Sequence, residues 1–276
     1  MSLFNKVAII GVGLIGGSIG LAIKKRGLAA EVVGMSRRKK SLRTALQKGA
    51  IDRGAQEMGI VRGADLMIFA TPVSLILKLA PLLRKIIKPE CIVSDVGSTK
   101  KEIVSRLEKI FPNYVGCHPL AGSEKRGIAH ARPDIFRNSL CIMTPTKNTK
   151  AKVKEKVKKL WNQLGAKVVY LDAKVHDEAL SFSSHLPHLA AFSLIGIVPR
   201  KYLRFAAGGL KDSTRIAASD SQLWADIFLS NKTNVLSAVD ALQGNLSRIK
   251  SAIKKKDKGL LIKILKEAQA KREFLG

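Results

Sequence analysis

The chain has 276 residues, and its 46% hydrophobic and 25% charged residues are typical of a soluble globular protein with a large core. Three cysteines, none in a CxxC pair, argue against a disulfide framework or a zinc site and favour reduced thiols in a cytoplasmic protein. The net charge of +28 favours anionic ligands, but the basic residues are dispersed without a recognition motif, so we expect no specific nucleic-acid partner.

The N-terminal segment contains a glycine pattern typical of dinucleotide-binding proteins. The uncharged stretch from Val7 to Ile23 is long enough for a signal peptide or a membrane span, but five glycines interrupt it. Within it, VAIIGVGLIGGSIGLAI fits G-x-G-x-x-G between a predicted strand and a predicted helix. We therefore expect neither a targeting segment nor a membrane partner. The predicted contacts with the cofactor are Gly11, Gly13, Leu14, Ile15 and Gly16.

The end of the second predicted strand bears on the choice of dinucleotide. NAD sites usually end this strand with an acidic residue about 20 positions after the first glycine. Here the strand runs from Glu31 to Met35 and is followed by Ser36, Arg37 and Arg38, which suit a 2′-phosphate. We therefore expect NADP to be favoured over NAD, although arginine also stacks on adenine in NAD sites.

Short apolar runs alternate with amphipathic segments over residues 1–171, which predicts a doubly wound, mainly parallel α/β domain of the Rossmann type. The runs are KVAIIG, AEVVGM, ADLMIFAT, CIVSDV, NYVGC, SLCIMTP and AKVVYL. Thr71 and Pro72 end the third of these runs, at the sheet edge where such folds bind ligands. They are either cofactor contacts or part of an ordinary strand-to-helix turn.

Residues 172–276 lack strand signals, which predicts an all-α second domain. Lys232–Ile253 and Leu260–Phe274 each have the pattern of one long helix. More than one apolar stripe runs along this region, and a surplus stripe is often buried against a second subunit. We therefore expect a homodimer formed through the helical domain.

The segment SDVGSTKKEI follows another predicted strand. Thr99 and Glu102 have the spacing of a capping box, which predicts that a helix starts there. Ser98 lies one residue outside this box and points toward the ligand crevice. Its hydroxyl is a candidate contact beside the nicotinamide.

A histidine stands at the end of a strand in NYVGCHPLAGSEKRG. Pro119 disfavours helical backbone at His118 and stiffens the chain after it. An imidazole at the ligand edge of the sheet can accept a proton from a hydroxyl near neutral pH. Because a nicotinamide cofactor implies hydride transfer, His118 is the candidate general base.

Two segments of the helical domain carry candidate substrate contacts. SFSSHLPHLAAF places His185 and His188 on one helical face, and without further ligands nearby a substrate contact is favoured over a metal site. GGLKDSTRIAASDSQLW places Asp212 and Arg215 three residues apart. Arg215 suits an anionic substrate and Asp212 can orient it, with a structural ion pair as the alternative.

In this order, GVGLIGGS, DVGST, CHPLAGSE, SHLPH and the KDSTRIA segment with its following tryptophan resemble the prephenate and arogenate dehydrogenase family of tyrosine biosynthesis. The resemblance covers essentially the whole chain. It implies oxidative decarboxylation of a dianionic cyclohexadienyl acid, prephenate to 4-hydroxyphenylpyruvate or arogenate to tyrosine, with hydride transfer to NAD(P)⁺. It also implies that His118 is the base, that Ser98 shares the hydroxyl contact and that Arg215 binds a carboxylate. The other implied pocket residues are Ser184, His188, Glu124 and Trp224.

Two other functions remain open at this point. A different Rossmann reductase with a helical dimer domain, such as an imine or 3-hydroxyacid dehydrogenase, shares the expected architecture but typically relies on a lysine in its helical domain. A polyanion-binding protein explains the net charge of +28, although 5% aromatic residues provide few stacking platforms for bases.

Overall fold

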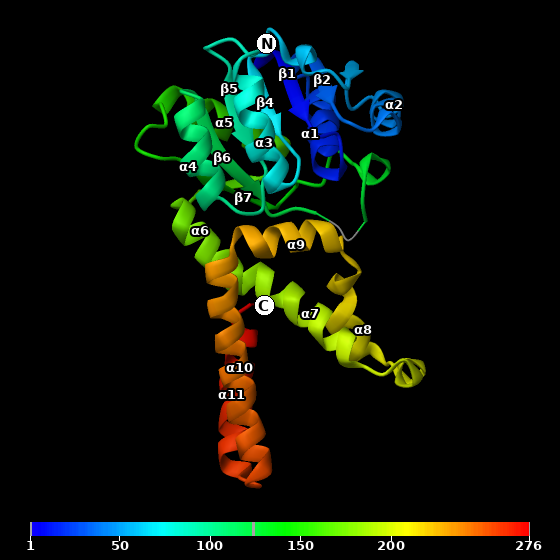
Figure 1. Cartoon of the computed structure of the whole chain (residues 1–276), viewed down its shortest axis with the longest axis vertical. Coiled ribbons are helices and arrows are strands. Elements are labelled where there is room, and N and C mark those ends of the chain that lie inside the picture. Colours follow the sequence, from blue (N-terminus) through cyan, green and yellow to red (C-terminus); the bar gives the residue numbers. More distant parts are fainter. Residues whose placement is uncertain (1, 123–124, 276) are drawn as a thin grey trace. The chain divides into compact units, whose positions relative to one another are not determined.

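The computed structural model describes residues 2–122 and 125–275. The chain divides into two compact units, Met1–Asn231 and Lys232–Gly276. The first unit contains a sheet with its covering helices and a second set of helices beyond one end of the strands (Figure 1). The second unit consists of two long helices.

The first unit is built on an eight-stranded sheet with the order β3-β2-β1-β4-β5-β6-β7-β8. Neighbouring strands are parallel except β6 and β7, which pair antiparallel. From β1 the chain adds β2 and β3 on one side and β4 and the later strands on the other. Doubly wound folds bind nucleotides in the crevice at this reversal of strand order, between β1 and β4. The strands are β1 (Phe4–Ile10), β2 (Ala29–Met35), β3 (Arg53–Ala55), β4 (Leu66–Phe69), β5 (Ile92–Asp95), β6 (Tyr114–Pro119), β7 (Leu140–Thr144) and β8 (Lys167–Tyr170).

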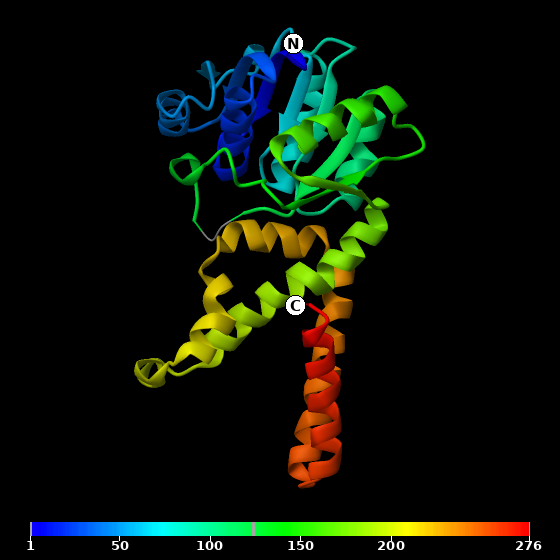
Figure 2. The ribbon, with the colours of Figure 1, turned by 180° about the vertical axis from the view of Figure 1, so that it is seen from behind.

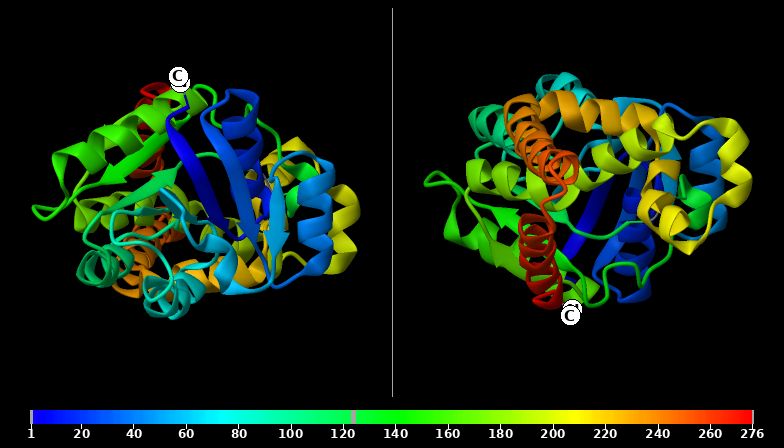
Figure 3. Two further views of the ribbon diagram at one scale, coloured as in Figure 1. Left: turned by 90° about the horizontal axis from the view of Figure 1, so that it is seen from above. Right: turned by 90° about the horizontal axis from the view of Figure 1, so that it is seen from below.

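Helices cover both faces of this sheet, as its uninterrupted apolar strands require. In β1, Val7 and Ile9 face one hydrophobic cluster while Ala8 and Ile10 face the other. The first cluster includes side chains of α1, α2 and α5, and the second includes those of α3 and α4. The ribbon shows helices on either side of the sheet (Figures 2 and 3). This architecture confirms the predicted α/β fold class. The helices are α1 (Leu14–Lys25), α2 (Lys39–Gln47), α3 (Val73–Arg84), α4 (Lys101–Ile110) and α5 (Ala151–Leu164).

A second set of helices in the first unit packs against the carboxyl ends of the parallel strands. The Asp226 carboxylate accepts a hydrogen bond from the backbone of Ser74 at the start of α3, 3.2 Å away. The Thr99 and Ser230 hydroxyls are 3.1 Å apart. These contacts place the helices over the ligand edge of the sheet. They are α6 (Ala173–Leu180), the π-helical turn η3 (Ser181–His185), α7 (Leu186–Ile197), α8 (Gly208–Thr214), the short turn η5 (Arg215–Ala218) and α9 (Ser221–Ser230).

α6, η3 and α7 form one helical segment, Ala173–Ile197, with a mean hydropathy of 1.2 in its most apolar window. By length and composition alone, it is also the one candidate for a membrane-crossing helix within residues 2–122 and 125–275. His176, Asp177 and His185 are nevertheless among the polar side chains of this segment that are buried inside the protein. Their partners, described below, belong to the site at the sheet edge.

The second unit is a pair of helices, α10 (Lys232–Lys254) and α11 (Lys258–Glu273). A tight turn joins them, with Lys256 in the left-handed region at φ 53° and Asp257 capping α11 by accepting from the backbone of Leu260 at 2.9 Å. Both helices were predicted from their sequence pattern, within a few residues at each end. Leu246 and Leu265 are among the large apolar side chains that remain more than half exposed on them.

The close approach of α1 to the β1 loop depends on Gly16. A Cβ at this position overlaps the carbonyl oxygen of Gly11 and lies 3.0 Å from the side chains of Ile9 and Ala70. We expect Gly16→Ala to lower the free energy of unfolding by about 1–3 kcal/mol, because overpacking displaces the helix from the strand. Chemical denaturation measures this change.

Gly13→Ala is the matched control, since no described atom lies within 4 Å of a Cβ added at Gly13, whose φ is −87°. We expect its free energy of unfolding to stay within about 0.5 kcal/mol of the wild-type value. Equal unfolding curves for the two variants would show that the helix does not depend on the close approach at Gly16.

Candidate active site

The loop between β1 and α1 has the geometry of a phosphate-binding turn. Gly11 has a φ of 100°, and a Cβ there approaches the Ala70 carbonyl oxygen to 2.5 Å, so only glycine fits. Gly13 is the N-cap residue of α1, with open space beside it and no described side chain capping the helix. Thr71 adjoins Gly11, and its buried Oγ1 has no partner among the described residues. Free helix amides, open space and an unpaired hydroxyl fit a dinucleotide pyrophosphate.

The predicted cofactor residues thus gather at the carboxyl ends of β1 and β4. Leu14 and Ile15 are half-buried in the first turn of α1. Pro72 is exposed and is the N-cap residue of α3. Their contact with a cofactor stays a prediction.

The segment after β2 is ordered by local hydrogen bonds. The Ser36 hydroxyl accepts from the backbone of Arg38 at 3.3 Å, and the Gln56 side chain donates to the carbonyl of Arg37 at 2.6 Å. Arg38 is also the N-cap residue of α2, and both arginines are exposed. The Ser36 hydroxyl therefore accepts a hydrogen bond within this turn.

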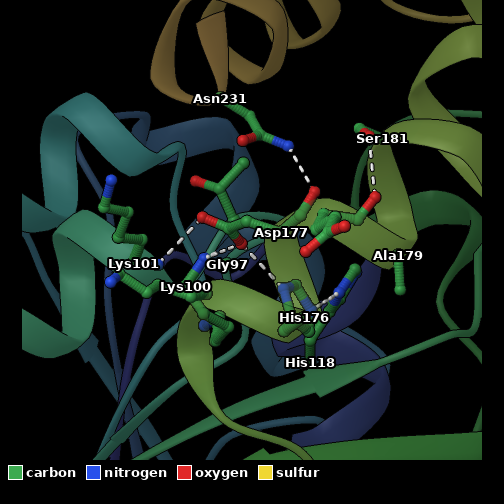
Figure 4. A network of polar contacts seen from close by, with 12 residues as sticks. Gly97, Lys100, Lys101, His118, His176, Asp177, Ala179, Ser181 and Asn231 are labelled. Carbon is green, nitrogen blue, oxygen red and sulfur yellow. Dashed lines mark hydrogen bonds and ion pairs between the residues drawn. The ribbon is translucent and has the colours of Figure 1, made fainter. Parts of the chain in front are cut away.

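The predicted base, His118, lies at the end of β6 and is half-buried between fully buried neighbours. Its Nδ1 is 2.9 Å from Nε2 of His176 in α6 (Figure 4). Burial lowers the pKa of His118 well below its ordinary value, and the nearby imidazoles and the Lys100 ammonium lower it further. His118 is therefore neutral near pH 7, as a general base must be.

Asp177 joins α6 to the start of α4. Its Oδ1 accepts from the backbone of Lys100 at 2.6 Å and lies 2.8 Å from Nδ1 of His176, while its Oδ2 accepts from the backbone of Lys101 at 2.9 Å. The carboxylate thus satisfies two free amides at a helix N-terminus, where a negative charge is favoured.

The capping box predicted from Thr99 and Glu102 is wrong. Glu102 forms an ion pair with Arg106 at 2.8 Å, and the Thr99 hydroxyl lies beside Ser230. α4 starts at Lys101, and Asp177 provides the cap that the local spacing had assigned to Thr99. A distant carboxylate that reaches two amides displaces a local hydroxyl that reaches one.

A buried ion pair underlies the strand that carries His118. The Lys100 ammonium is fully buried, pairs with Asp95 and donates to the carbonyl of Cys117 at 2.8 Å. Asp95 also accepts from the Tyr114 hydroxyl at 2.7 Å and from the Gly97 backbone at 2.8 Å. Such a pair is tolerated in the interior because both ions keep their hydrogen bonds. It leaves a positive charge close to the histidines.

His185 is a second buried histidine of the helical segment. The Asn231 amide donates to the Asp177 carbonyl at 2.7 Å and reaches Nδ1 of His185 at 3.2 Å. Nε2 of His185 therefore carries the hydrogen, and it has no partner among residues 2–122 and 125–275. Burial lowers the pKa of His185 to about 4.

The remaining predicted substrate residues lie along α7, α8 and α9. The His188 ring stacks on Trp224 with 3.6 Å between centroids, and its Nδ1 donates to the Ser184 carbonyl at 3.0 Å. Burial lowers the pKa of His188, and the charge of Arg215 lowers it further, which places Arg215 near this ring.

For three further predicted substrate residues, at most the position in the chain and the burial bear on the prediction. Ser98 is half-buried between β5 and α4, and Asp212 is exposed on α8. Glu124 lies outside the described residues. The structure therefore brings His188, Trp224, Ser184 and Arg215 together, and the substrate roles of all these residues stay predictions.

Five residues of this site were missed in the sequence: Asp95, Lys100, His176, Asp177 and Asn231. His176 is 58 positions from His118, in a helix without a recognisable motif. The one usable signal was the adjacent pair His176 and Asp177. If such a polar pair is buried, it needs hydrogen-bond partners elsewhere in the fold.

Comparison with known proteins identifies the family. The sequence profile of the prephenate dehydrogenase nucleotide-binding domain matches residues 19–170, and that of the prephenate dehydrogenase dimerization domain matches residues 172–267. The chain belongs to the prephenate dehydrogenase family. This result confirms the predicted resemblance and the class of oxidoreductase.

Individual relatives agree with the profiles over nearly the whole chain. Prephenate dehydrogenase of Bacillus subtilis is 35% identical over 98% of this chain and 76% of that protein. Cyclohexadienyl dehydrogenase of Zymomonas mobilis is 32% identical over 99% of this chain and 96% of that protein. Among solved structures, Aquifex aeolicus prephenate dehydrogenase in complex with hydroxyphenyl propionate and NAD⁺ has a TM-score of 0.93 and 33% identity, covering 99% of this chain and 98% of that one.

The prediction that NADP is favoured over NAD is wrong. The Aquifex aeolicus structure, a close neighbour, holds NAD⁺. In the present chain the Ser36 hydroxyl accepts from the Arg38 backbone, so it has a local structural role in the turn that needs no phosphate. Guanidinium groups at this strand end do not require a phosphate, because arginine also stacks on aromatic rings such as adenine.

The buried histidines make stability depend on pH. The pKa of His185 is lowered from 6.5 to about 4 in the folded state, so the unfolded state binds the proton first. The stabilisation from this residue is complete above pH 6.5 and is lost as the pH falls toward 4. We expect the free energy of unfolding to fall by about 3 kcal/mol on this account, measured by chemical denaturation between pH 7 and pH 4.

His118 and His176, whose pKa values are also lowered, add to the loss in the same direction. We expect His185→Asn to show a smaller pH dependence than the wild type. His130→Asn, which changes an exposed histidine, is the control and keeps the wild-type slope. An unaltered slope in His185→Asn would contradict the assignment.

Proposed function

We propose that this protein is an NAD⁺-dependent dehydrogenase that oxidises and decarboxylates a cyclohexadienyl acid, prephenate or its amino counterpart arogenate. The observation that carries the proposal is a neutral histidine, His118, held at the ligand edge of the sheet. The glycine loop that fits a dinucleotide opens onto the same edge. Membership of the prephenate dehydrogenase family supports the same chemistry.

The bound nicotinamide supplies a hydride acceptor. The substrate hydroxyl loses its proton to His118, the carbon that bore it loses a hydride, and the ring carboxylate leaves as carbon dioxide while the ring becomes aromatic. The phenolate oxygen that decarboxylation leaves then takes up a proton, so each substrate molecule loses one hydride and one carbon dioxide with no net release of a proton. Since aromatisation is strongly favourable, the protein has mainly to orient the substrate and remove the proton.

The other site residues take positions suited to a dianionic substrate. In the proposal, Arg215 binds one carboxylate and Asp212 orients that arginine. Ser98 shares the substrate hydroxyl with His118. His188, Ser184 and Trp224 form the pocket wall, with the stacked His188 and Trp224 rings at its centre. Glu124 retains its proposed role in positioning the substrate.

The proposal extends to the domain organisation, the oligomeric state and the cellular location of the protein. We propose a dinucleotide-binding domain of residues 1–171 and a helical substrate and dimerisation domain of residues 172–276. The match of residues 172–267 to a dimerization domain and the exposed apolar side chains of α10 and α11 support a homodimer. A soluble, cytoplasmic enzyme fits the three free, buried cysteines.

The first prediction of this proposal concerns turnover. We expect the wild-type protein to reduce NAD⁺ with prephenate or arogenate, followed by absorbance of the reduced cofactor. We expect His118→Asn to lower kcat by roughly 10²–10⁴-fold, because the amide cannot accept the proton. The Michaelis constant for NAD⁺ should change little.

His130→Asn is the matched control for this variant, since His130 is exposed and has no proposed role. Folded wild-type protein that binds dinucleotide but reduces none with either substrate would overturn the proposed function. Reduction with a short 3-hydroxyacid in its place would favour the other reductases. Wild-type turnover in His118→Asn would remove His118 as the base.

A second prediction concerns the substrate carboxylate. We expect Arg215→Gln to raise the Michaelis constant for the cyclohexadienyl substrate by roughly 10–100-fold, because a charge-assisted hydrogen bond is lost. The constant for NAD⁺ should remain near the wild-type value. Arg106→Gln, an exposed arginine paired with Glu102 on α4, is the control. An unchanged substrate constant in Arg215→Gln would exclude the carboxylate role.

A further inference from the structure

The site contains a hydrogen-bond chain from Asp177 through His176 to His118 (Figure 4). We propose that this chain sets the tautomer of His118, with Nδ1 protonated and Nε2 left as the nitrogen that accepts the substrate proton. His176 and Asp177 are then positioning residues of the reaction. The inference rests on the proposed function for its catalytic consequence, whereas the tautomer itself is a property of the free protein.

The direction of the chain starts at Asp177. Both of its oxygens accept backbone amides, from Lys100 and Lys101, at the N-terminus of α4. With both oxygens accepting N–H donors at a helix N-terminus, the carboxylate acts here only as an acceptor of hydrogen bonds. Nδ1 of His176, 2.8 Å from Oδ1, must therefore carry a hydrogen.

The next link is His176 itself. Its side chain is fully buried, and burial lowers its pKa despite the opposing effect of Asp177. A neutral imidazole with its hydrogen on Nδ1 presents a lone pair at Nε2. This lone pair faces Nδ1 of His118 at 2.9 Å, so His118 must donate from Nδ1.

The last link is His118. Because its pKa is also lowered, it is neutral near pH 7 and carries one ring hydrogen only. With that hydrogen on Nδ1, Nε2 holds the lone pair. When Nε2 takes the substrate proton, the imidazolium keeps its hydrogen bond to His176, and the carboxylate of Asp177 stabilises the new charge without taking a proton.

The reverse arrangement is unfavourable. It would turn a lone pair of His176 toward the Asp177 carboxylate at 2.8 Å and would place the hydrogen of His118 on Nε2, where it blocks the base. In addition, the chain joins β6 to α6 through the amides of α4. The base is therefore correctly protonated only when the helical segment that starts at Ala173 is docked on the sheet edge.

Kinetics of two His176 variants test the proposal. We expect His176→Leu, which removes the acceptor, to lower kcat by roughly 10²-fold or more with little change in either Michaelis constant, since His176 contacts neither reactant in the proposed scheme. We expect His176→Gln, whose amide oxygen can replace the Nε2 acceptor, to recover at least about tenfold of that loss. His130→Leu is the control at an exposed histidine.

Nuclear magnetic resonance of isotopically labelled histidine in the free wild-type protein gives the readout that needs no substrate and no turnover. We expect the His118 signal, identified by its loss in His118→Asn, to show a protonated Nδ1 and an unprotonated Nε2. A protonated Nε2, or two tautomers in exchange, would overturn the proposal. So would wild-type kcat in a folded His176→Leu variant.

These outcomes separate the two proposals. If the wild-type protein fails to oxidise prephenate and arogenate, the proposed function fails, and the tautomer measurement still decides the inference. If the wild-type protein is active and His118 has the opposite tautomer, only the inference fails.

Discussion

The carboxylate of Asp177 is the interaction on which the site depends. It accepts two backbone amides at the start of α4 and faces the ring of His176, and through that ring it reaches His118. One side chain therefore caps a helix of the sheet domain, docks α6 and determines where the hydrogens of two imidazoles lie. Because the carboxylate acts here only as an acceptor, every donor in the chain has a fixed direction. Geometry and proton position are thus set by the same contact.

Electrostatics favour the neutral form of His118, the proposed base. Burial disfavours the charged form of each imidazole, and the Lys100 ammonium, although paired with Asp95, adds a further cost to protonating them. The protein as a whole, in contrast, carries a large positive charge. The net charge of +28 favours the approach of anionic ligands.

The helical segment Ala173–Ile197 combines apolar composition with specific polar contacts. Its middle is a π-helical turn at Ser181–His185, followed by Pro187, which cannot donate a backbone hydrogen bond. Such turns shift the faces of a helix and are frequent at functional sites. Here the turn separates His176, which faces the sheet domain, from His188, which stacks on Trp224. One helical segment therefore contacts both the proposed base and the proposed pocket wall.

The sequence by itself determined the features that short stretches encode. The alternation of apolar runs predicted the sheet and its covering helices, the spacing of Gly11, Gly13 and Gly16 predicted the turn, and a histidine before Pro119 at a strand end predicted the candidate base. These signals are local because backbone conformation and burial depend on neighbouring residues. The three-residue strand β3 gave no such signal, since it is too short to show a period.

Only the tertiary structure decided which polar groups meet. His176 and His118 are 58 positions apart, and no sequence spacing relates an α6 carboxylate to the amides of α4. For the same reason the local capping pattern at Thr99 and the arginines after β2 were misleading. A side chain takes the partner that folding brings within hydrogen-bond distance, and that partner is set by the packing of whole elements rather than by its neighbours in the chain.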